Sequence, residues 1–428
     1  MKITRGYKTE LDPTATQREY FVRACGTARY VYNWALADRT AMYEEQIAAL
    51  KAGDEEKANT LRREQSFFSQ CKRWIAYRDE NTPWAKEVGA GVALWELKNL
   101  DTAYRNFFRR VKQGGGAPGF PRFKSRRHGV GGFHASTIRV ESCRVRVPII
   151  GWVKLKERDY LPTDGVAVHR VTVRERAGRW YIAITADIEV PEPVAVGDDL
   201  AVHLGVRMLA TVSDGRQFAN AHPLEQSLRR LRRAQQKLAR CEDGSKRRQG
   251  AKLRVAILHE RVANLRREQH HQASAAITGR HASEQDRPRR LAVEDWDVKA
   301  MLEADHANGR AAKRRLSRAI ADSAMADLGR MIRYKATWGG SEVIEGERFY
   351  ASSRTCSRCG WVWAEMTLGH LVFRCQQCGL ALDREENAVR NVQGLLADEG
   401  ELSVDGRSPE TENGRGGKVS PSSGGTRL

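Results

Sequence analysis

Two closely spaced cysteine pairs constrain this chain more than any other feature of its sequence. Two residues lie within each pair and 15 residues, 360–374, lie between the pairs, which are Cys356, Cys359, Cys375 and Cys378. This is the spacing of zinc sites built from two C-x2-C pairs. A glycine follows each pair and allows a tight turn that points backbone amides at the sulfur atoms. Four thiolates fill a tetrahedral shell, so the pattern predicts a structural zinc ion, without which so short a segment lacks an adequate core.

The charge of the chain predicts its partner. The 428 residues include 73 Lys and Arg against 53 Asp and Glu, a formal net charge of +20. Phosphates attract Lys and Arg while counterions are released, so the excess favours nucleic acid, with a charged, solvated surface as the alternative. Apolar residues make up 41% of the chain, which excludes a wholly disordered protein. The sequence has no apolar run that could span a bilayer and no apolar signal core, so we expect a cytoplasmic, nucleoid-associated protein without a membrane partner.

The hydrophobic pattern changes along the chain. Residues 2–8 alternate as a strand does, and residues 14–36 and 84–111 have helical spacing, with a charged helical stretch at 44–63 between them. After a glycine-rich break at 114–119, several short segments between residues 138 and 184 alternate with a period of two. Short strands separated by turn residues predict a small antiparallel barrel.

A third region begins near residue 200. Strand patterns at 200–205, 209–212, 290–294 and 342–344 alternate with helical segments at 224–280 and 311–338, which indicates an α/β sheet. The basic segment 224–280 is interrupted at 243–245 and is typical of a helical hairpin. Residues from about 397 onward are rich in Gly, Ser, Pro and Glu, a composition that predicts disorder.

Three positions in this third region form the layout of an RNase-H-like nuclease. The first is the strand residue at position 203, in a hairpin that is followed by Ser-Asp-Gly at 213–215. The second is Glu294, an acid that ends a later strand, and the third is Asp383, an acid that opens a helix just after the cysteine pairs. With motifs at 8–14, 28–34, 119–124, 293–295, 352–360 and 382–388, the sequence resembles TnpB, the OrfB-type family of transposon-encoded RNA-guided nucleases related to the type V CRISPR effectors. The resemblance covers nearly the whole chain except the tail.

The resemblance implies a multidomain α+β fold. Its expected parts are a wedge β-barrel (1–10 and 117–195), a helical recognition lobe (11–116), a RuvC-like, RNase-H-like α/β domain (196–355 and 379–396), an inserted zinc ribbon (356–378) and a disordered tail (397–428). The implied partners are a guide RNA and double-stranded target DNA beside a short adjacent motif, while the oligomeric state stays open. Cleavage in such a family needs three carboxylates that hold two divalent ions.

The first of those acids is missing here. Glu294 and Asp383 carry over as catalytic acids, with a strand-end acid and a helix N-cap as their structural alternatives. Where the family has Asp in a V-D-L-G strand, this chain has His203. Magnesium prefers oxygen ligands, and imidazole brings nitrogen without negative charge. We expect no compensation from the acids nearby, since Asp199 is about 13 Å away along the strand at ~3.3 Å per residue; the others are Asp198, Asp214, Asp295 and Asp297.

Several functional hypotheses follow. The favoured one is an RNA-guided DNA-binding protein whose nuclease activity is lost, with Mg²⁺ or Mn²⁺ bound weakly or not at all, acting as a target-site repressor. The alternative is an active RNA-guided endonuclease in which His203 accepts a softer ion such as Mn²⁺. A decayed transposon remnant and a plain zinc-ribbon nucleic-acid-binding protein without a guide are the other hypotheses.

Basic residues indicate where nucleic acid would lie. Two sit in a loop with aromatic neighbours and five lie along the helical hairpin: Arg122, Lys124, Arg229, Arg232, Arg233, Lys246 and Arg247. Basic residues mixed with aromatic ones suit backbone tracking and base stacking. Each residue alone could equally be a solvated surface charge. Together they predict an RNA–DNA channel.

Overall fold

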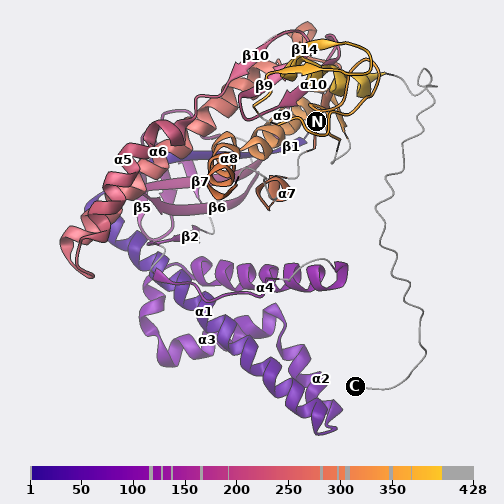
Figure 1. Cartoon of the computed structure of the whole chain (residues 1–428). Coiled ribbons are helices and arrows are strands. Elements are labelled where there is room, and N and C mark those ends of the chain that lie inside the picture. Colours follow the sequence, from indigo (N-terminus) through magenta and orange to yellow (C-terminus); the bar gives the residue numbers. More distant parts are fainter. Residues whose placement is uncertain are drawn as a thin grey trace.

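The computed structural model describes residues 2–114, 119–126, 129–135, 138–163, 167–190, 192–279, 283–295, 298–303, 309–346, 350–367 and 369–397. Figure 1 shows helices α1–α4 at one end of the molecule, a large sheet in the middle, and a second sheet with helix α10 at the other end. The predicted tail lies outside the described residues from 398 onward. No helix among the described residues is long and apolar enough to cross a membrane.

Four helices form the first end of the molecule. They are α1 (Ala15–Lys51), α2 (Glu55–Glu64), α3 (Phe67–Asn81) and α4 (Ala90–Gln113), with the short helix η1 (Pro83–Glu87) before α4. Thr14 caps α1 in a capping box with Gln17, which satisfies free amides of the first turn. The charged stretch predicted at 44–63 is the end of α1 and most of α2. Buried side chains of α1, α3 and α4 form a common core that includes Val31, Trp74 and Leu100.

The central sheet has seven antiparallel strands in the order β2-β6-β7-β1-β5-β4-β3. These strands are β1 (Lys2–Asp12), β2 (Gly132–Ala135), β3 (Arg139–Glu141), β4 (Arg144–Val147), β5 (Gly151–Leu155), β6 (Ala167–Arg176) and β7 (Arg179–Glu189). The predicted barrel is wrong, because this sheet is open. Strand β2 at one edge packs against α1 and α4 and does not pair with the three-residue strand β3 at the other edge.

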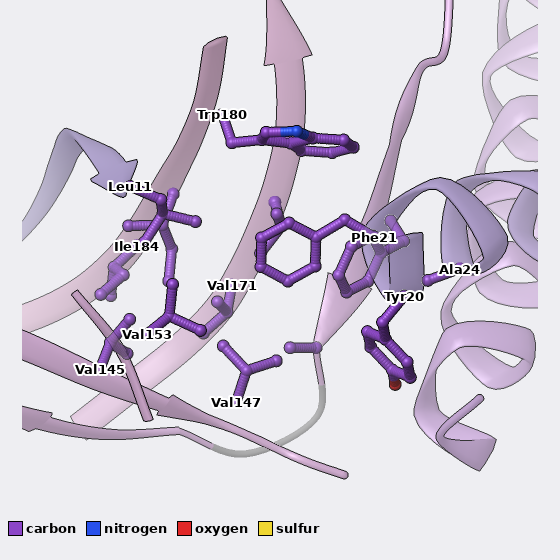
Figure 2. Packing of buried hydrophobic residues seen from close by; sticks show 14 of the residues in the cluster. Leu11, Tyr20, Phe21, Ala24, Val145, Val147, Val153, Val171, Trp180 and Ile184 are labelled. Atoms are coloured by element: carbon purple, nitrogen blue, oxygen red, sulfur yellow. The ribbon is translucent and has the colours of Figure 1, made fainter. Parts of the chain in front are cut away.

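Helix α1 provides the physical reason for the open sheet. The side chains of Tyr20, Phe21 and Ala24 enter the core between the strands, as Figure 2 shows beside Trp180 and Val171. The ring centroids of Phe21 and Trp180 are 5.0 Å apart, and the Phe21 side chain is fully buried. A helix that covers the apolar face and an edge supplies the burial that barrel closure would otherwise provide.

The second sheet has five strands in the order β10-β9-β8-β11-β12. They are β8 (Leu200–Leu204), β9 (Met208–Val212), β10 (Gln217–Ala219), β11 (Arg290–Val293) and β12 (Glu342–Glu345). Strands β8, β9 and β10 form an antiparallel meander, whereas β11 is parallel to both β8 and β12. The α/β sheet predicted for this region is therefore confirmed.

Helices cover both faces of the five-stranded sheet. The remaining helices are α5 (Pro223–Ala239), α6 (Lys246–Ile277), α7 (Val298–Glu303), α8 (Gly309–Ser323), α9 (Met325–Gly339) and α10 (Arg384–Gln393), with short helices η3 (Glu284–Asp286) and η4 (Gly394–Leu396). One face packs on α6, α8 and α9. The opposite face packs on α10 through Val389 and Val392. Strands β13 (Val372–Arg374) and β14 (Ala381–Asp383) form a hairpin that leads directly into α10.

Candidate functional site

The alternation of side chains along β8 decides which way His203 points. Ala201 packs on the α10 face of the sheet, and Val202 and Leu204 pack on the opposite face. Because successive side chains of a strand point to opposite faces, His203 faces α10 with Ala201. Val202 is in register with Val293 on the parallel strand β11, so Glu294, the next residue, lies beside His203. Two strands thus bring together residues that are 91 positions apart.

His203 bridges two buried carboxylates. Its Nδ1 atom lies 2.7 Å from Glu294 Oε2, and its Nε2 atom lies 3.1 Å from Glu385 Oε2. The exposed fractions of His203, Glu294 and Glu385 are 3%, 7% and 5%. We call these three residues the Glu–His–Glu cluster. Both ring nitrogens therefore face carboxylate oxygens in a site from which water is largely excluded.

His203 and the two glutamates of the cluster attract one another electrostatically. Burial alone disfavours a charged imidazole, but the carboxylates of Glu294 and Glu385 outweigh burial and raise the pKa of His203 to about 9. Burial likewise raises the pKa of Glu385, but the hydrogen bond and charge of His203 outweigh it, so this pKa is lowered overall. At neutral pH the cluster is thus an imidazolium between two carboxylates, and each nitrogen donates a hydrogen bond.

Glu294 is held from its other side by Ser352. The Ser352 hydroxyl donates to Glu294 Oε1, and the Ser352 side chain is buried. The backbone oxygen of Ser352 accepts a hydrogen bond of 2.7 Å from Asn391 Nδ2, so α10 fixes this segment. Glu294 is also tied through its backbone oxygen, which accepts from Arg333 at 3.1 Å. The glutamate is therefore oriented toward His203 by α9, α10 and the segment before the cysteines.

The two acids at the start of α10 have different places. Asp383 is the N-cap of the helix and accepts from the amides of Glu385 and Glu386 at 2.9 and 3.4 Å. Its Oδ2 atom faces Arg207 Nη2 at 3.1 Å. The side chain that reaches His203 from this helix is that of Glu385. Arg207 also approaches Glu385, with 3.7 Å between Nε and Oε1.

Sequence reasoning missed Glu385, although a signal was present. Glu385 is followed by Ala388, Val389 and Val392 at helical spacings of three, four and seven, and all four side chains are buried. The same spacings from Asp383 give Glu386, Asn387 and Arg390, a polar set. The apolar stripe of α10 therefore carries Glu385 toward the sheet.

Gly205 allows Glu385 to come this close. A Cβ atom at position 205 would lie 2.9 Å from the Met208 carbonyl oxygen and 3.1 Å from Glu385 Oε2. The first distance is shorter than real Cβ contacts allow. The close approach of the backbone at this point thus requires glycine.

The other nearby acids lie elsewhere. Asp199 accepts hydrogen bonds from Arg289 and Arg290 at the start of β11, with Nη2–Oδ2 distances of 2.9 and 2.6 Å. Asp214 pairs with Arg216 at 2.6 Å in the surface turn. Asp198 is exposed, Asp295 lies 3.9 Å from Arg333, and Asp297 is outside the described residues. None of the four acids among them that the structure describes (Asp198, Asp199, Asp214 and Asp295) is part of the Glu–His–Glu cluster.

The Glu–His–Glu cluster does not have the form of a divalent metal site. Magnesium and manganese need several oxygen ligands directed at one point. Here the imidazole ring lies between the two carboxylates and donates a hydrogen bond to each. Among the described residues, the four cysteines are the single group of three or more His, Cys, Asp and Glu side chains whose ligand atoms all lie within 4.8 Å of one another.

The four cysteines form a compact cluster before α10. The Sγ atoms of Cys356 and Cys378 are 3.6 Å apart, and those of Cys359 and Cys375 are 3.5 Å apart. Zinc–sulfur bonds of ~2.3 Å in a tetrahedron require sulfur atoms about 3.8 Å apart, so the donor set fits zinc. Gly360 and Gly379 have φ of 77° and 72°, a backbone conformation that glycine adopts without strain.

A basic groove of about 1150 Å³ lies between α1, α4, the exposed face of β6 and β7, and helix α6. Seven cationic side chains and two acidic ones line it. The cations are Lys8, Arg29, Lys124, Arg170, Arg174, Arg176 and Arg267. Arg170, Arg174 and Arg176 follow one another at even spacings on β6, a period-two signal that the sequence analysis did not use.

The predicted nucleic-acid residues are exposed but not gathered in one place. Lys124 lines the basic groove, where its Nζ pairs with Glu96 at 2.6 Å and lies 4.0 Å from the centre of the Tyr32 ring. Arg122 lies in the same loop. The other five are exposed on the helical hairpin of α5 and α6: Arg229, Arg232, Arg233, Lys246 and Arg247. Their contact with nucleic acid stays a prediction.

Comparisons with known families match three parts of the chain. Residues 171–305 match a family described as "Probable transposase", residues 326–392 match "Cas12f1-like, TNB domain", and residues 1–48 match "Helix-turn-helix domain". In the structure, the last of these segments is β1 followed by most of the single long helix α1.

Two curated relatives align over almost their whole length. A putative RNA-guided DNA endonuclease, InsQ, of Escherichia coli (strain K12) is 30% identical over 401 residues, which are 92% of this chain and 92% of that protein. A putative RNA-guided DNA endonuclease of Streptomyces pristinaespiralis is 28% identical, over 98% of this chain and 96% of that protein. The match to a chain of a solved CRISPR-Cas12f ternary complex covers 89% of this chain and 82% of that chain, with a TM-score of 0.32 and 13% identity.

The fold, the cysteine cluster and these matches define a class, the transposase-related α+β proteins of several domains that carry a four-cysteine cluster near their C-terminal helix. Within that class, the chain belongs to the TnpB family of RNA-guided DNA endonucleases. The sequence-based resemblance is therefore confirmed.

Proposed function

We propose that this protein is an RNA-guided DNA-binding member of the TnpB family whose nuclease site is inactive because His203 replaces a carboxylate. The observation that carries the proposal is the Glu–His–Glu cluster, in which the imidazole stands between Glu294 and Glu385. Binding to a target without cleavage would make the protein a repressor of the bound site.

The cluster disfavours metal for two reasons. The ring occupies the space between the carboxylates, and its positive charge opposes the arrival of a second cation. Removing one partner of a buried ion pair costs about 3–5 kcal/mol, so a divalent ion would have to overcome a comparable free energy to displace His203. The third carboxylate of the ancestral site would then be Glu385, with Asp383 as the helix cap.

The strand order of the second sheet supports a RuvC-like domain. A three-stranded antiparallel meander continued by two strands parallel to its first strand is the arrangement expected of an RNase-H-like fold. His203 lies on the first strand, and Glu294 directly follows the fourth. We assign this domain to residues 196–355 and 379–396, with a ribbon at 356–378 held by structural zinc. Helices α1–α4 are the recognition lobe, and the open seven-stranded sheet takes the place of the expected barrel.

The basic groove supports a guide RNA and target DNA as partners. Its seven cations lie between the helical lobe and the seven-stranded sheet, where they can contact successive phosphates. In RNA-guided systems base pairing reads the sequence, and the protein reads the shape of the duplex and a short adjacent motif. Such partners place the protein on nucleic acid in the cytoplasm.

The test expresses the protein with its native flanking DNA and sequences the RNA that co-purifies. The complex is then incubated with a matched and a scrambled plasmid in Mg²⁺ and in Mn²⁺. We expect the native complex to bind the matched plasmid and leave it intact, and His203→Asp to cut it. His203→Asp combined with Glu294→Gln is the control, and it should bind without cutting.

Three results would contradict the proposal. Cutting by the native complex that Glu294→Gln abolishes would establish the active endonuclease. Absence of a discrete RNA would remove the guided function. A His203→Asp complex that binds but does not cut would show that His203 is not the cause of inactivity.

The competing hypothesis, in which His203 binds Mn²⁺, has less support. A histidine ligand must present an unprotonated ring nitrogen to the ion. Both nitrogens of His203 face carboxylates, and the raised pKa keeps the ring protonated at neutral pH.

A further inference from the structure

A second hollow, of about 540 Å³, lies against one face of α1. Gly26, Tyr30, Trp34 and Trp84 are among the residues that line it. Arg23 and Arg29 line it as well. The volume is in the range of sites for small organic ligands, ~300–1,000 Å³. We call it the α1 hollow.

Gly26 is unexplained by the packing of the protein. It lies in the interior of α1, where glycine is destabilising relative to alanine. A Cβ atom at this position would meet nothing within 4 Å, so no neighbour requires its absence. The missing side chain leaves space at this lining residue for a ligand to approach the helix backbone.

The aromatic side chains of the hollow are held in place. The Trp84 and Tyr30 rings form a T-shaped pair with centroids 5.3 Å apart, and the Tyr30 hydroxyl shares a hydrogen bond of 2.9 Å with Tyr77. Trp34 packs against Trp74 at 5.1 Å. Trp84 is nevertheless 44% exposed, which is unusual for so large an apolar ring. A rigid, exposed aromatic face is what a stacking partner needs.

The charges around the hollow indicate the class of that partner. Arg29 lines both the α1 hollow and the basic groove, so the two lie next to each other. Arg23 pairs with Glu87 at 2.8 Å, but both side chains are 56% exposed, and exposed pairs of this kind contribute only ~0–1 kcal/mol. A phosphate can therefore compete for Arg23. An aromatic face beside two arginines suits an unpaired nucleotide, whose base stacks while its phosphate is neutralised.

We propose that the α1 hollow binds one unpaired nucleotide of the nucleic acid that runs through the basic groove, with its base against Trp84 and its phosphate at Arg29 and Arg23. The inference rests on the proposed function, since it needs nucleic acid in the groove. The nucleotide comes from an unpaired position of the RNA or from a separated DNA strand. Both offer the same base and phosphate.

The test uses the full-length protein and two single-stranded decamers of the same sequence, one RNA and one DNA, each containing the fluorescent adenine analogue 2-aminopurine. Stacking on tryptophan quenches this fluorescence, and anisotropy gives the affinity. The variants are Gly26→Ala, Trp84→Ala and Trp84→Phe, with melting temperature recorded for each. Phe68→Ala is the matched control, because Phe68 is 77% exposed on α3 and lies outside the hollow.

Stacking on one aromatic ring contributes ~1–3 kcal/mol, so Trp84→Ala should weaken binding about 5- to 150-fold and abolish the quenching. Trp84→Phe should retain most of the affinity. Gly26→Ala should fold at least as stably as the native chain and still bind more weakly, because its methyl group takes up space at the lining of the hollow. The decamer that loses affinity identifies the source of the nucleotide.

Two outcomes are decisive against the inference. If the native protein binds a decamer and both Gly26→Ala and Trp84→Ala bind it equally well, the hollow has no such role, while the proposed function stands. If the native protein binds neither decamer nor any other nucleic acid, the proposed function fails and the inference fails with it.

Discussion

The Nδ1 atom of His203 lies 2.7 Å from Oε2 of Glu294, across two parallel strands that are in register at Val202 and Val293. The opposite side of the same ring meets Glu385 from α10. An imidazolium thus satisfies two buried carboxylates that would otherwise repel each other. The site is closed by the protein's own cation, which is the physical basis of the proposed loss of cleavage.

The first prediction concerns His203→Asp and magnesium. The variant places three carboxylates together, so we expect it to be less stable than the native protein by ~3–5 kcal/mol in a buffer without Mg²⁺. Magnesium at about 100 times its dissociation constant should restore ~2.7 kcal/mol. The native protein should show no such gain. Thermal unfolding with and without Mg²⁺ measures both, and a native melting temperature that rises as much as that of the variant would contradict the closed cluster.

A second prediction separates Glu385 from Asp383. Glu385→Gln in the native chain leaves His203 with one carboxylate and should lower the free energy of unfolding by several kcal/mol. Asp383→Asn should change it by less than about 0.5 kcal/mol, because asparagine caps helices as well as aspartate does. In the His203→Asp background, Glu385→Gln should abolish the recovered cleavage and Asp383→Asn should leave most of it. Urea unfolding and plasmid cleavage give the two readouts; the reverse order would restore Asp383 as the catalytic acid.

The cysteine cluster leads to a third prediction. The native chain should hold about one zinc ion, and Cys356→Ala should lose it. Because Ser357 donates to Asn387 Oδ1 at 3.1 Å, loss of the ion should also loosen α10 and increase proteolysis there. Cys143→Ala, at an exposed cysteine outside the cluster, is the control and should keep its zinc. Elemental analysis and limited proteolysis measure these effects, and a zinc-free variant with native protease resistance would disprove the link to α10.

Asp199 provides a prediction on pH. Hydrogen bonds from Arg289 and Arg290 hold the pKa of its carboxyl far below the usual value, although burial opposes them. A lowered pKa in the folded state stabilises the protein above the unfolded pKa of ~3.9, and this stability is lost as the pH falls further. Asp199→Asn should therefore be less stable by about 2 kcal/mol at pH 7, with a flatter decline below pH ~4. Urea unfolding between neutral and acid pH checks this, and parallel curves for the two proteins would count against it.

The fifth prediction tests the basic groove. Arg174 is exposed on β6 and lines the groove, so Arg174→Gln should weaken nucleic-acid binding and lower the slope of log K against log salt by about one. Arg62→Gln removes an exposed arginine of α2 outside the groove and should leave the slope unchanged. Titrations at several salt concentrations compare them. Applied to Arg232→Gln, the same measurement decides whether the α5–α6 hairpin also contacts nucleic acid.

Much of the site could be read from local sequence patterns. The spacing of Cys356, Cys359, Cys375 and Cys378 predicts a cluster that the structure contains. The alternation of residues in strand patterns indicates that His203 and Glu294 belong to a sheet. Ser213 to Gly215 predict a turn, and the structure has that turn directly after β9. These features depend on neighbours within a few residues, so the chain itself contains the information.

Local sequence patterns could not show whether the first sheet closes into a barrel. Period-two patterns predict strands but not which edges meet, and a barrel and an open sheet share the same alternation. The sheet stays open because the Phe21 ring of α1 fills the core beside Trp180. The helical spacing of Phe21 alone does not tell which surface it will cover.

The sequence by itself determined that an imidazole replaces an acid at position 203, that four cysteines can share an ion, and that the chain carries an excess of positive charge. Only the tertiary structure decided that Glu385 meets His203 while Asp383 caps α10. Both acids are equally compatible with a helix start. The difference arises because the apolar stripe of α10 packs on β8, and burial of that stripe fixes the rotation of the helix about its axis.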